Sequence, residues 1–138
     1  MVNVVRYEKM ADMFLNTNKH RSEWISNGID KKRLASILFT LEHKKQLLST
    51  STSFGMPKAY IAWVYCKDGV TLDELKNKQD DCFTEDGKNV FPLFMAGAIG
   101  LGLARKYGKK LTDLAKQRGG KLISYRHGRL VEFGGDSV

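Results

Sequence analysis

One histidine, His20, lies in a polar segment that could carry acid–base chemistry. It stands three residues after Thr17 and directly before Arg21, where a predicted helix has ended. Histidine is the usual general base near neutral pH, because its pKa is about 6.5. A single histidine in a polar segment is also common at protein surfaces, so its spacing alone leaves both interpretations open.

Three glycines, Gly97, Gly100 and Gly102, lie between a predicted strand and a predicted helix. Glycines in such a turn allow backbone N–H groups to approach a phosphate, and the N-terminus of a helix favours negative charge. In acetyltransferases a turn of this kind holds the pyrophosphate of coenzyme A. The alternative is that small residues let the helix pack closely on the sheet, and close packing is the outcome that we expect.

Two aromatic residues, Tyr60 and Trp63, lie in one apolar segment. Aromatic side chains on a sheet beside a basic surface can stack nucleic-acid bases. Aromatic residues of an apolar strand are more often part of the hydrophobic core. We therefore expect core positions, and binding of a ligand by these rings is the alternative.

The chain is strongly basic, with 23 Lys and Arg residues against 15 Asp and Glu residues and a net charge of +8. Between Leu103 and Arg129, Asp113 is the single acid among nine basic residues. Such a field attracts nucleic acid, an anionic membrane surface or an acidic protein. A solvated helix face followed by an edge strand would give the same pattern.

Helical periodicity predicts the elements that would position these residues. Apolar side chains recur at i, i+3, i+4 and i+7 near residues 4–16, and a similar repeat predicts a helix at about 31–43. A long helix is expected at about 101–117, where Gly108 could kink it. Thr71 and Glu74 form a capping box that predicts a short helix.

Five segments have the character of strands. Residues 46–53 and 59–66 flank a Gly-Met-Pro turn, and 121–126 and 129–133 flank a His-Gly turn, so each pair predicts an antiparallel hairpin. Residues 90–98 are continuously apolar, which is typical of a central strand that is buried on both faces. Pro92 within this segment removes one hydrogen-bond donor from the ladder.

The order of these elements predicts a mixed α/β fold with a largely antiparallel sheet flanked by helices, as in N-acetyltransferases. The length of 138 residues predicts one domain over 1–138, with a mobile tail at 134–138. No histidine pair has metal-ligand spacing, and Cys66 and Cys82 form no disulfide framework, so we expect no metal and reduced thiols. Without an apolar leader or an apolar run of bilayer length, a cytoplasmic protein is expected.

Three short segments resemble one protein family, the lysine acyltransferases of the haemolysin C type that activate RTX toxins. Pro57-Lys-Ala-Tyr60-Ile-Ala-Trp63 resembles that family's Pro-x-Ala-Tyr-x-x-Trp strand. The Thr17-x-x-His20-Arg21 segment resembles its Ser-x-x-His-Arg segment. Residues 128–135 resemble its C-terminal Gly-x-x-x-Glu-Phe-x-Gly-Gly strand, one residue shorter. The three segments occur in the same order over about residues 10–135, so the chain resembles a short and divergent member.

The resemblance implies an acetyltransferase-like fold and transfer of a fatty acyl group from acyl carrier protein, or from acyl-coenzyme A, to a lysine ε-amine of a protein. It implies that His20 acts as catalytic base with Thr17 beside it, and that Arg21, Tyr60 and Trp63 bind substrate. Acyl carrier protein is strongly acidic, which suits the basic charge of this chain. No tightly bound cofactor is implied.

One departure from the family concerns its essential aspartate on the central strand, because the alignment places Leu93 there. A histidine without its orienting carboxylate can lose orders of magnitude in rate. A second interpretation is therefore a catalytically inactive protein of the same fold, which binds an acidic host protein or nucleic acid through its basic face. A third is a small-molecule acetyltransferase that uses the glycine turn. A homodimer is also left open.

Overall fold

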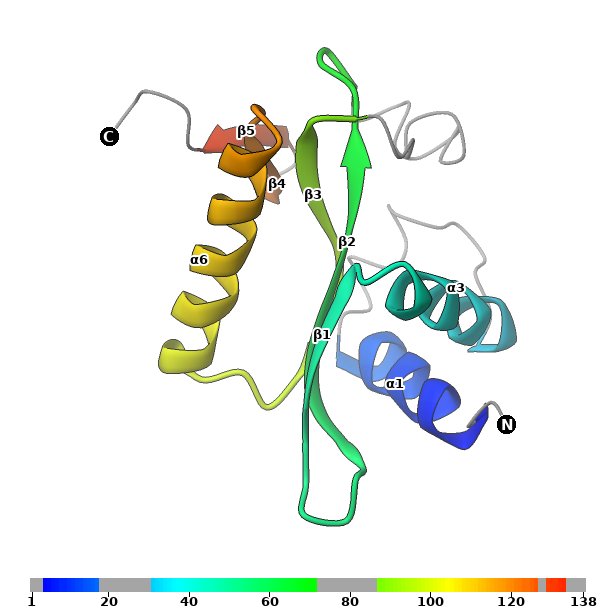
Figure 1. Cartoon of the computed structure of the whole chain (residues 1–138). Helices are drawn as coiled ribbons and strands as arrows, with labels where there is room; N and C mark the ends of the chain where they lie inside the picture. Colours follow the sequence, from blue (N-terminus) through cyan, green and yellow to red (C-terminus); the bar gives the residue numbers. More distant parts are fainter. Residues whose placement is uncertain (1–3, 18–30, 72–86, 127–128, 134–138) are drawn as a thin grey trace. The chain divides into compact units, whose positions relative to one another are not determined.

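The computed structural model describes residues 4–17, 31–71, 87–126 and 129–133. These residues form a mixed α/β fold with a largely antiparallel sheet, as the order of elements predicts. The short helix expected after Thr71 and the tail at 134–138 lie outside the described residues. The described elements, labelled in Figure 1, are α1 (Val4–Thr17), α3 (Lys31–His43), β1 (Leu47–Ser51), β2 (Pro57–Cys66), β3 (Asn89–Gly97), α6 (Leu101–Gln117), β4 (Leu122–Arg126) and β5 (Arg129–Phe133).

The five described strands form one sheet in the order β1-β2-β3-β4-β5. The β1/β2 and β4/β5 pairs are antiparallel, whereas β3 and β4 are parallel and pair through Val90 and Leu122. The Val90 N–H donates to the Lys121 carbonyl oxygen at 2.9 Å. Alternate residues of a strand direct their backbone groups to the same edge, so Pro92 occupies the next donor position and has no N–H to offer. The proline therefore limits the parallel pairing.

The chain divides into two compact units, which comprise residues 1–63 with 93–99, and residues 64–92 with 100–138. Strands β2 and β3 each contribute residues to both units. The expectation of a single domain stays a prediction.

In the first unit, the hydrophobic core forms where α1, α3 and parts of β2 and β3 meet. Met10, Phe14 and Leu38 are completely buried, and the rings of Phe14 and Phe94 pack edge to face with their centroids 4.9 Å apart. Helices α1 and α3 lie side by side (Figure 1). The apolar repeats that predict these helices are therefore the faces that they bury.

The β1–β2 hairpin is held by hydrogen bonds at both ends. At the open end, the Gln46 side chain donates to the Trp63 carbonyl oxygen at 3.0 Å, and the Trp63 N–H donates to the Gln46 carbonyl oxygen at 3.0 Å. At the turn, the Thr52 hydroxyl accepts from the N–H groups of Phe54 and Met56. Gly55 has φ of 82°, which a residue with a side chain rarely adopts.

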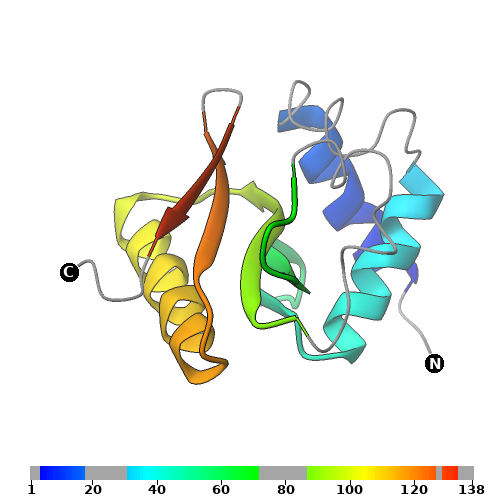
Figure 2. The ribbon, with the colours of Figure 1, turned by 90° about the horizontal axis from the view of Figure 1, so that it is seen from above.

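In the second unit, α6 packs against β4 (Figure 2). It buries Tyr107, Leu111 and Ala115, which are spaced by four residues on one face of the helix. Ile123 of β4 and Val90 of β3 are also buried. The helix continues without interruption through Gly108, so this glycine does not split it.

The observed bounds agree closely with those predicted from periodicity. The helices at 31–43 and 101–117 are confirmed to the residue, and the central strand begins and ends one residue earlier than expected. The first hairpin differs more: β1 is shorter than the predicted strand, whereas β2 begins at Pro57 rather than Ala59. Proline suits a first strand position, because its missing N–H costs least there.

Candidate functional site

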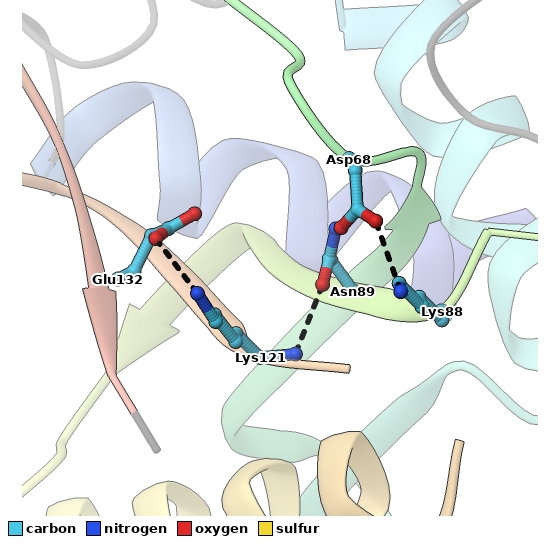
Figure 3. A network of polar contacts seen from close by, with 5 residues as sticks. All are labelled: Asp68, Lys88, Asn89, Lys121 and Glu132. Carbon is cyan, nitrogen blue, oxygen red and sulfur yellow. Dashed lines mark hydrogen bonds and ion pairs between the residues drawn. The ribbon is translucent and has the colours of Figure 1, made fainter. Parts of the chain in front are cut away.

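The second unit contains an open polar pocket of about 720 Å³. Its volume lies in the usual range for small-molecule sites, about 300–1,000 Å³. Side chains that follow β2, stand at the start of β3, precede β4 and belong to β5 meet around it (Figure 3). The pocket is lined by Asp68, Gly69, Lys88, Asn89, Lys116, Gly119, Gly120, Lys121 and Glu132.

Asn89 organises this pocket from a buried position. Only 2% of it is exposed, and its side chain uses both a donor and the acceptor. Its amide nitrogen donates to Asp68 Oδ1 at 2.9 Å, and its Oδ1 accepts the Lys121 N–H at 2.9 Å. A buried amide with satisfied partners holds its neighbours in place, because breaking either bond would leave a buried polar group unpaired.

The two residues that Asn89 contacts, Asp68 and Lys121, each form an ion pair on the solvent side. Lys88 Nζ lies 2.9 Å from Asp68 Oδ2, and Lys121 Nζ lies 3.3 Å from Glu132 Oε1 (Figure 3). The Asn89 hydrogen bond and then the Lys88 ammonium hold the pKa of Asp68 below its usual value. All four charged side chains are at least half exposed, so these pairs contribute little stability and can exchange partners readily.

The last turn of α6 closes one side of the pocket. The N–H groups of Gly119 and Gly120 donate to the carbonyl oxygens of Lys116 and Ala115, which is the Schellman arrangement. Gly119 has φ of 75°, and a Cβ on Gly120 would lie 2.1 Å from the Lys88 carbonyl oxygen. Both glycines are therefore required where they stand.

Arg118 joins this turn to the neighbouring loop and strand. Its Nε and Nη2 atoms donate to the Gly87 carbonyl oxygen at 3.0 and 2.6 Å. Its guanidinium carbon lies 3.5 Å from the centre of the Tyr65 ring, a cation–π arrangement. Arg118 thus connects the end of α6 to the end of β2, and its guanidinium interacts with the Gly87 carbonyl oxygen and the Tyr65 ring.

The first turn of α6 is open, which corrects the expectation that its glycines serve close packing. A Cβ on Gly100 or Gly102 would meet no heavy atom within 4 Å. Within the described part of the chain, the N–H groups of Leu101, Gly102 and Leu103 have no hydrogen-bond partner, and no side chain caps the helix at Gly100. Gly97 alone meets a tight contact, because its Cβ would lie 2.3 Å from the Lys58 carbonyl oxygen.

The solvent side of α6 carries the basic residues that the sequence analysis singled out. They are exposed, whereas Asp113 is the single acid on this helix and pairs with Lys109 at 3.0 Å. We call these five side chains the basic face of α6: Arg105, Lys106, Lys109, Lys110 and Lys116. The part of the predicted basic surface at the end of β4 and the start of β5 depends on Arg126 and Arg129, whose side chains are outside the described part of the structure.

His20, which the resemblance makes the catalytic base, and Arg21, which it assigns to substrate binding, fall outside the described part of the chain. Thr17, placed beside the base, is described only as the last residue of α1. Their roles stay predictions.

The two aromatic residues assigned to substrate binding lie in the core of the first unit. Tyr60 is completely buried and Trp63 is 2% exposed. The Tyr60 hydroxyl donates to the Met10 carbonyl oxygen at 2.7 Å, and burial raises the pKa of this phenol. The expectation of core positions is confirmed, and contact of either ring with a substrate stays a prediction.

Leu93, which stands at the place of the family's aspartate, is a buried core residue with 4% exposure. Within the described ranges, no group of three or more His, Cys, Asp or Glu side chains could hold a metal ion. Of the helices described, none has both the length and the apolar character needed to cross a membrane.

Comparisons of the chain with known proteins identify no relative: no protein-family model, curated protein or solved structure matches it. No pattern in the sequence predicted that Asp68, Asn89, Lys121 and Glu132 meet, because these residues lie far apart along the chain. Asn89 carried one weak signal, a polar residue directly before a continuously apolar strand.

Proposed function

We propose that this chain is a protein lysine acyltransferase that takes its acyl group from acyl carrier protein. The observation that best supports this proposal is the β3–α6–β4 segment, in which one long helix connects two parallel strands and begins at an open glycine turn. In acetyltransferases, a turn of this kind between a strand and a helix holds the pyrophosphate of the acyl donor coenzyme A. The three sequence segments that resemble the toxin-activating family add independent support.

The reaction transfers an acyl group from sulfur to nitrogen. The target lysine is unreactive while its ε-amine is protonated, so a base must first remove a proton, and the resemblance assigns this role to His20. The neutral amine attacks the thioester carbonyl carbon, the C–S bond breaks and an amide forms. The thiol of the donor leaves with the proton that the nitrogen loses as the amide forms, and the histidine passes the proton that it first removed to water, so it is free for another cycle.

The donor could also be acyl-coenzyme A. Free N–H groups at the start of a helix attract phosphate, and the first turn of α6 offers them beside Gly102. The two donors place the same acyl thioester on the same type of pantetheine arm. They differ in what surrounds the arm, which is an acidic protein in one case and a nucleotide in the other.

A second candidate is a non-catalytic binding protein of the same fold. The observation that favours it is the strand β3, which has no acidic residue between Asn89 and Gly97 and buries Leu93 where the family has its aspartate. No carboxylate from this strand can orient a catalytic histidine.

Intact-mass measurement tests the proposal. The purified chain is incubated with a lysine-containing protein mixture and either acyl carrier protein loaded with a fatty acyl group or the matching acyl-coenzyme A. We expect amide-linked acylation from the loaded carrier protein, lost in His20→Ala and kept in His43→Gln, which replaces an exposed histidine at the end of α3. Absence of acylation with both donors would favour the non-catalytic candidate.

A further inference from the structure

The basic face of α6 is strongly positive, and Asp113 is the single acidic residue on this helix. The helix buries Tyr107, Leu111 and Ala115 on one side and exposes all five basic side chains on the other. Lys109 pairs with Asp113, whereas the other four bases have no ion-pair partner in the part of the chain that the structure describes. Four cations are thus available to an external partner.

The spacing of these bases suits a straight, regularly charged partner. Arg105 and Lys109 are four residues apart, as are Lys106 and Lys110, so the helix carries two adjacent rows of positive charge. From Arg105 to Lys116 the surface extends for about 16 Å at 1.5 Å per residue. A partner helix of three turns, with acidic residues at the same spacing, would match this length.

An exposed apolar residue extends the face at one end. Leu101 is 70% exposed and precedes Arg105 by four residues, so its side chain lies one turn away on the same side of α6. A phosphate backbone offers nothing that would bury this side chain. An amphipathic helix offers both acidic side chains for the bases and an apolar side chain for Leu101.

We infer that the basic face of α6, together with Leu101, docks an acidic amphipathic helix of a partner protein. Opposite charges raise the rate of encounter and select the partner, while a small apolar contact removed from water adds affinity. The choice of acyl carrier protein as the probe rests on the proposed function, but the test measures binding alone.

The experiment titrates fluorescently labelled acyl carrier protein, in its form without pantetheine arm or acyl group, with the full chain. The face variant is Lys106→Glu with Lys110→Glu. Its matched control, Lys9→Glu with Lys32→Glu, changes the net charge equally on exposed positions of α1 and α3. We expect the face variant to weaken binding at least about tenfold and the control less than about threefold. Circular dichroism confirms that each variant is folded.

A second arm separates a protein partner from nucleic acid. Leu101→Ser is expected to weaken binding of the carrier protein about threefold to tenfold, because it removes an apolar contact. A labelled DNA duplex, titrated in parallel, should bind more weakly than the carrier protein at the same salt concentration.

Three results would overturn the inference: no binding of the carrier protein, an equal loss in the face variant and its control, or tighter binding of DNA with no effect of Leu101→Ser. Binding without acyl transfer would overturn the proposed function and leave this inference standing. Acyl transfer that is unchanged in the face variant would overturn this inference and leave the proposed function standing.

Discussion

The two ends of α6 each carry two glycines, yet the structure uses them in opposite ways. At the first turn, Gly100 and Gly102 face open space, and the nearby N–H groups have no partner among the residues described. At the last turn, Gly119 and Gly120 satisfy the carbonyl oxygens of the helix and leave no room for a side chain. A glycine pair is therefore informative only together with what packs against it.

The polar contacts of the two ends differ in the same way. The last turn is tied down by Arg118 and by the Asn89 side chain, which accepts the Lys121 N–H. The first turn has no side-chain cap, and Leu101 is largely exposed. One end of the helix is thus completed by this chain itself, while the other is open to a ligand or partner. Four substitutions test this difference between the two ends of α6 and the contacts around them.

The largest effect is expected for Gly120→Ala. Its Cβ would lie 2.1 Å from the Lys88 carbonyl oxygen and 2.4 Å from the adjoining carbon, both backbone atoms that cannot move aside cheaply. The substitution should lower the free energy of unfolding by about 3 kcal/mol, measured by urea denaturation. Gly108→Ala is the control, because its Cβ meets nothing within 4 Å. A loss below about 1 kcal/mol in Gly120→Ala would contradict the closed end of the helix.

Arg118→Ala should have the next largest effect. It removes two charge-assisted hydrogen bonds to the Gly87 carbonyl oxygen and the stacking over Tyr65, and it leaves that buried carbonyl unpaired. We expect a loss of about 2 kcal/mol in urea denaturation. Arg118→Lys should recover only a small part, because an ammonium lacks the planar fork that reaches one acceptor with two donors. Full recovery in the lysine variant would show that charge alone suffices.

Gly102→Ala should instead stabilise the protein slightly. Alanine restricts the unfolded chain more than glycine, and at this position its methyl group meets no neighbour. An increase of about 0.5 kcal/mol is expected, seen as a higher melting temperature. Gly97→Ala is the comparison, because φ of 103° and the Lys58 carbonyl oxygen both disfavour a side chain there. A destabilised Gly102→Ala would restore the packing hypothesis.

The smallest effect concerns Asp68, whose pKa is lowered mainly by the Asn89 hydrogen bond and also by Lys88. A group with a lowered folded-state pKa stabilises the fold above its unfolded pKa, about 3.9, and loses this contribution as the pH falls through the folded value. Asp68→Asn should therefore lower the melting temperature slightly at pH 7, and the difference from the parent should shrink near pH 3. A difference that is constant with pH would exclude this electrostatic origin.

The order of the elements and most of their bounds were predictable from the sequence. Apolar residues at helical spacing predict helices α3 and α6, and a continuous apolar run predicts β3. These signals are local, because a helix or strand must turn its own apolar side chains toward the core. The exposure of the basic residues of α6 was predictable for the same reason, since they occupy the opposite side of the helix.

The pocket, and the way in which each glycine pair of α6 is packed, depend on tertiary contacts between distant segments. Asn89 contacts Asp68 and Lys121, which lie 21 and 32 residues away along the chain. Gly102 and Gly120 both lie at an end of α6 and two residues or fewer from another glycine, but of these two only Gly120 faces another backbone segment. No local pattern encodes such a contact, because it depends on which distant strand end arrives there. The local pattern of residues sets which faces of the helices and strands are apolar and which are charged, and folding sets which of their polar groups meet.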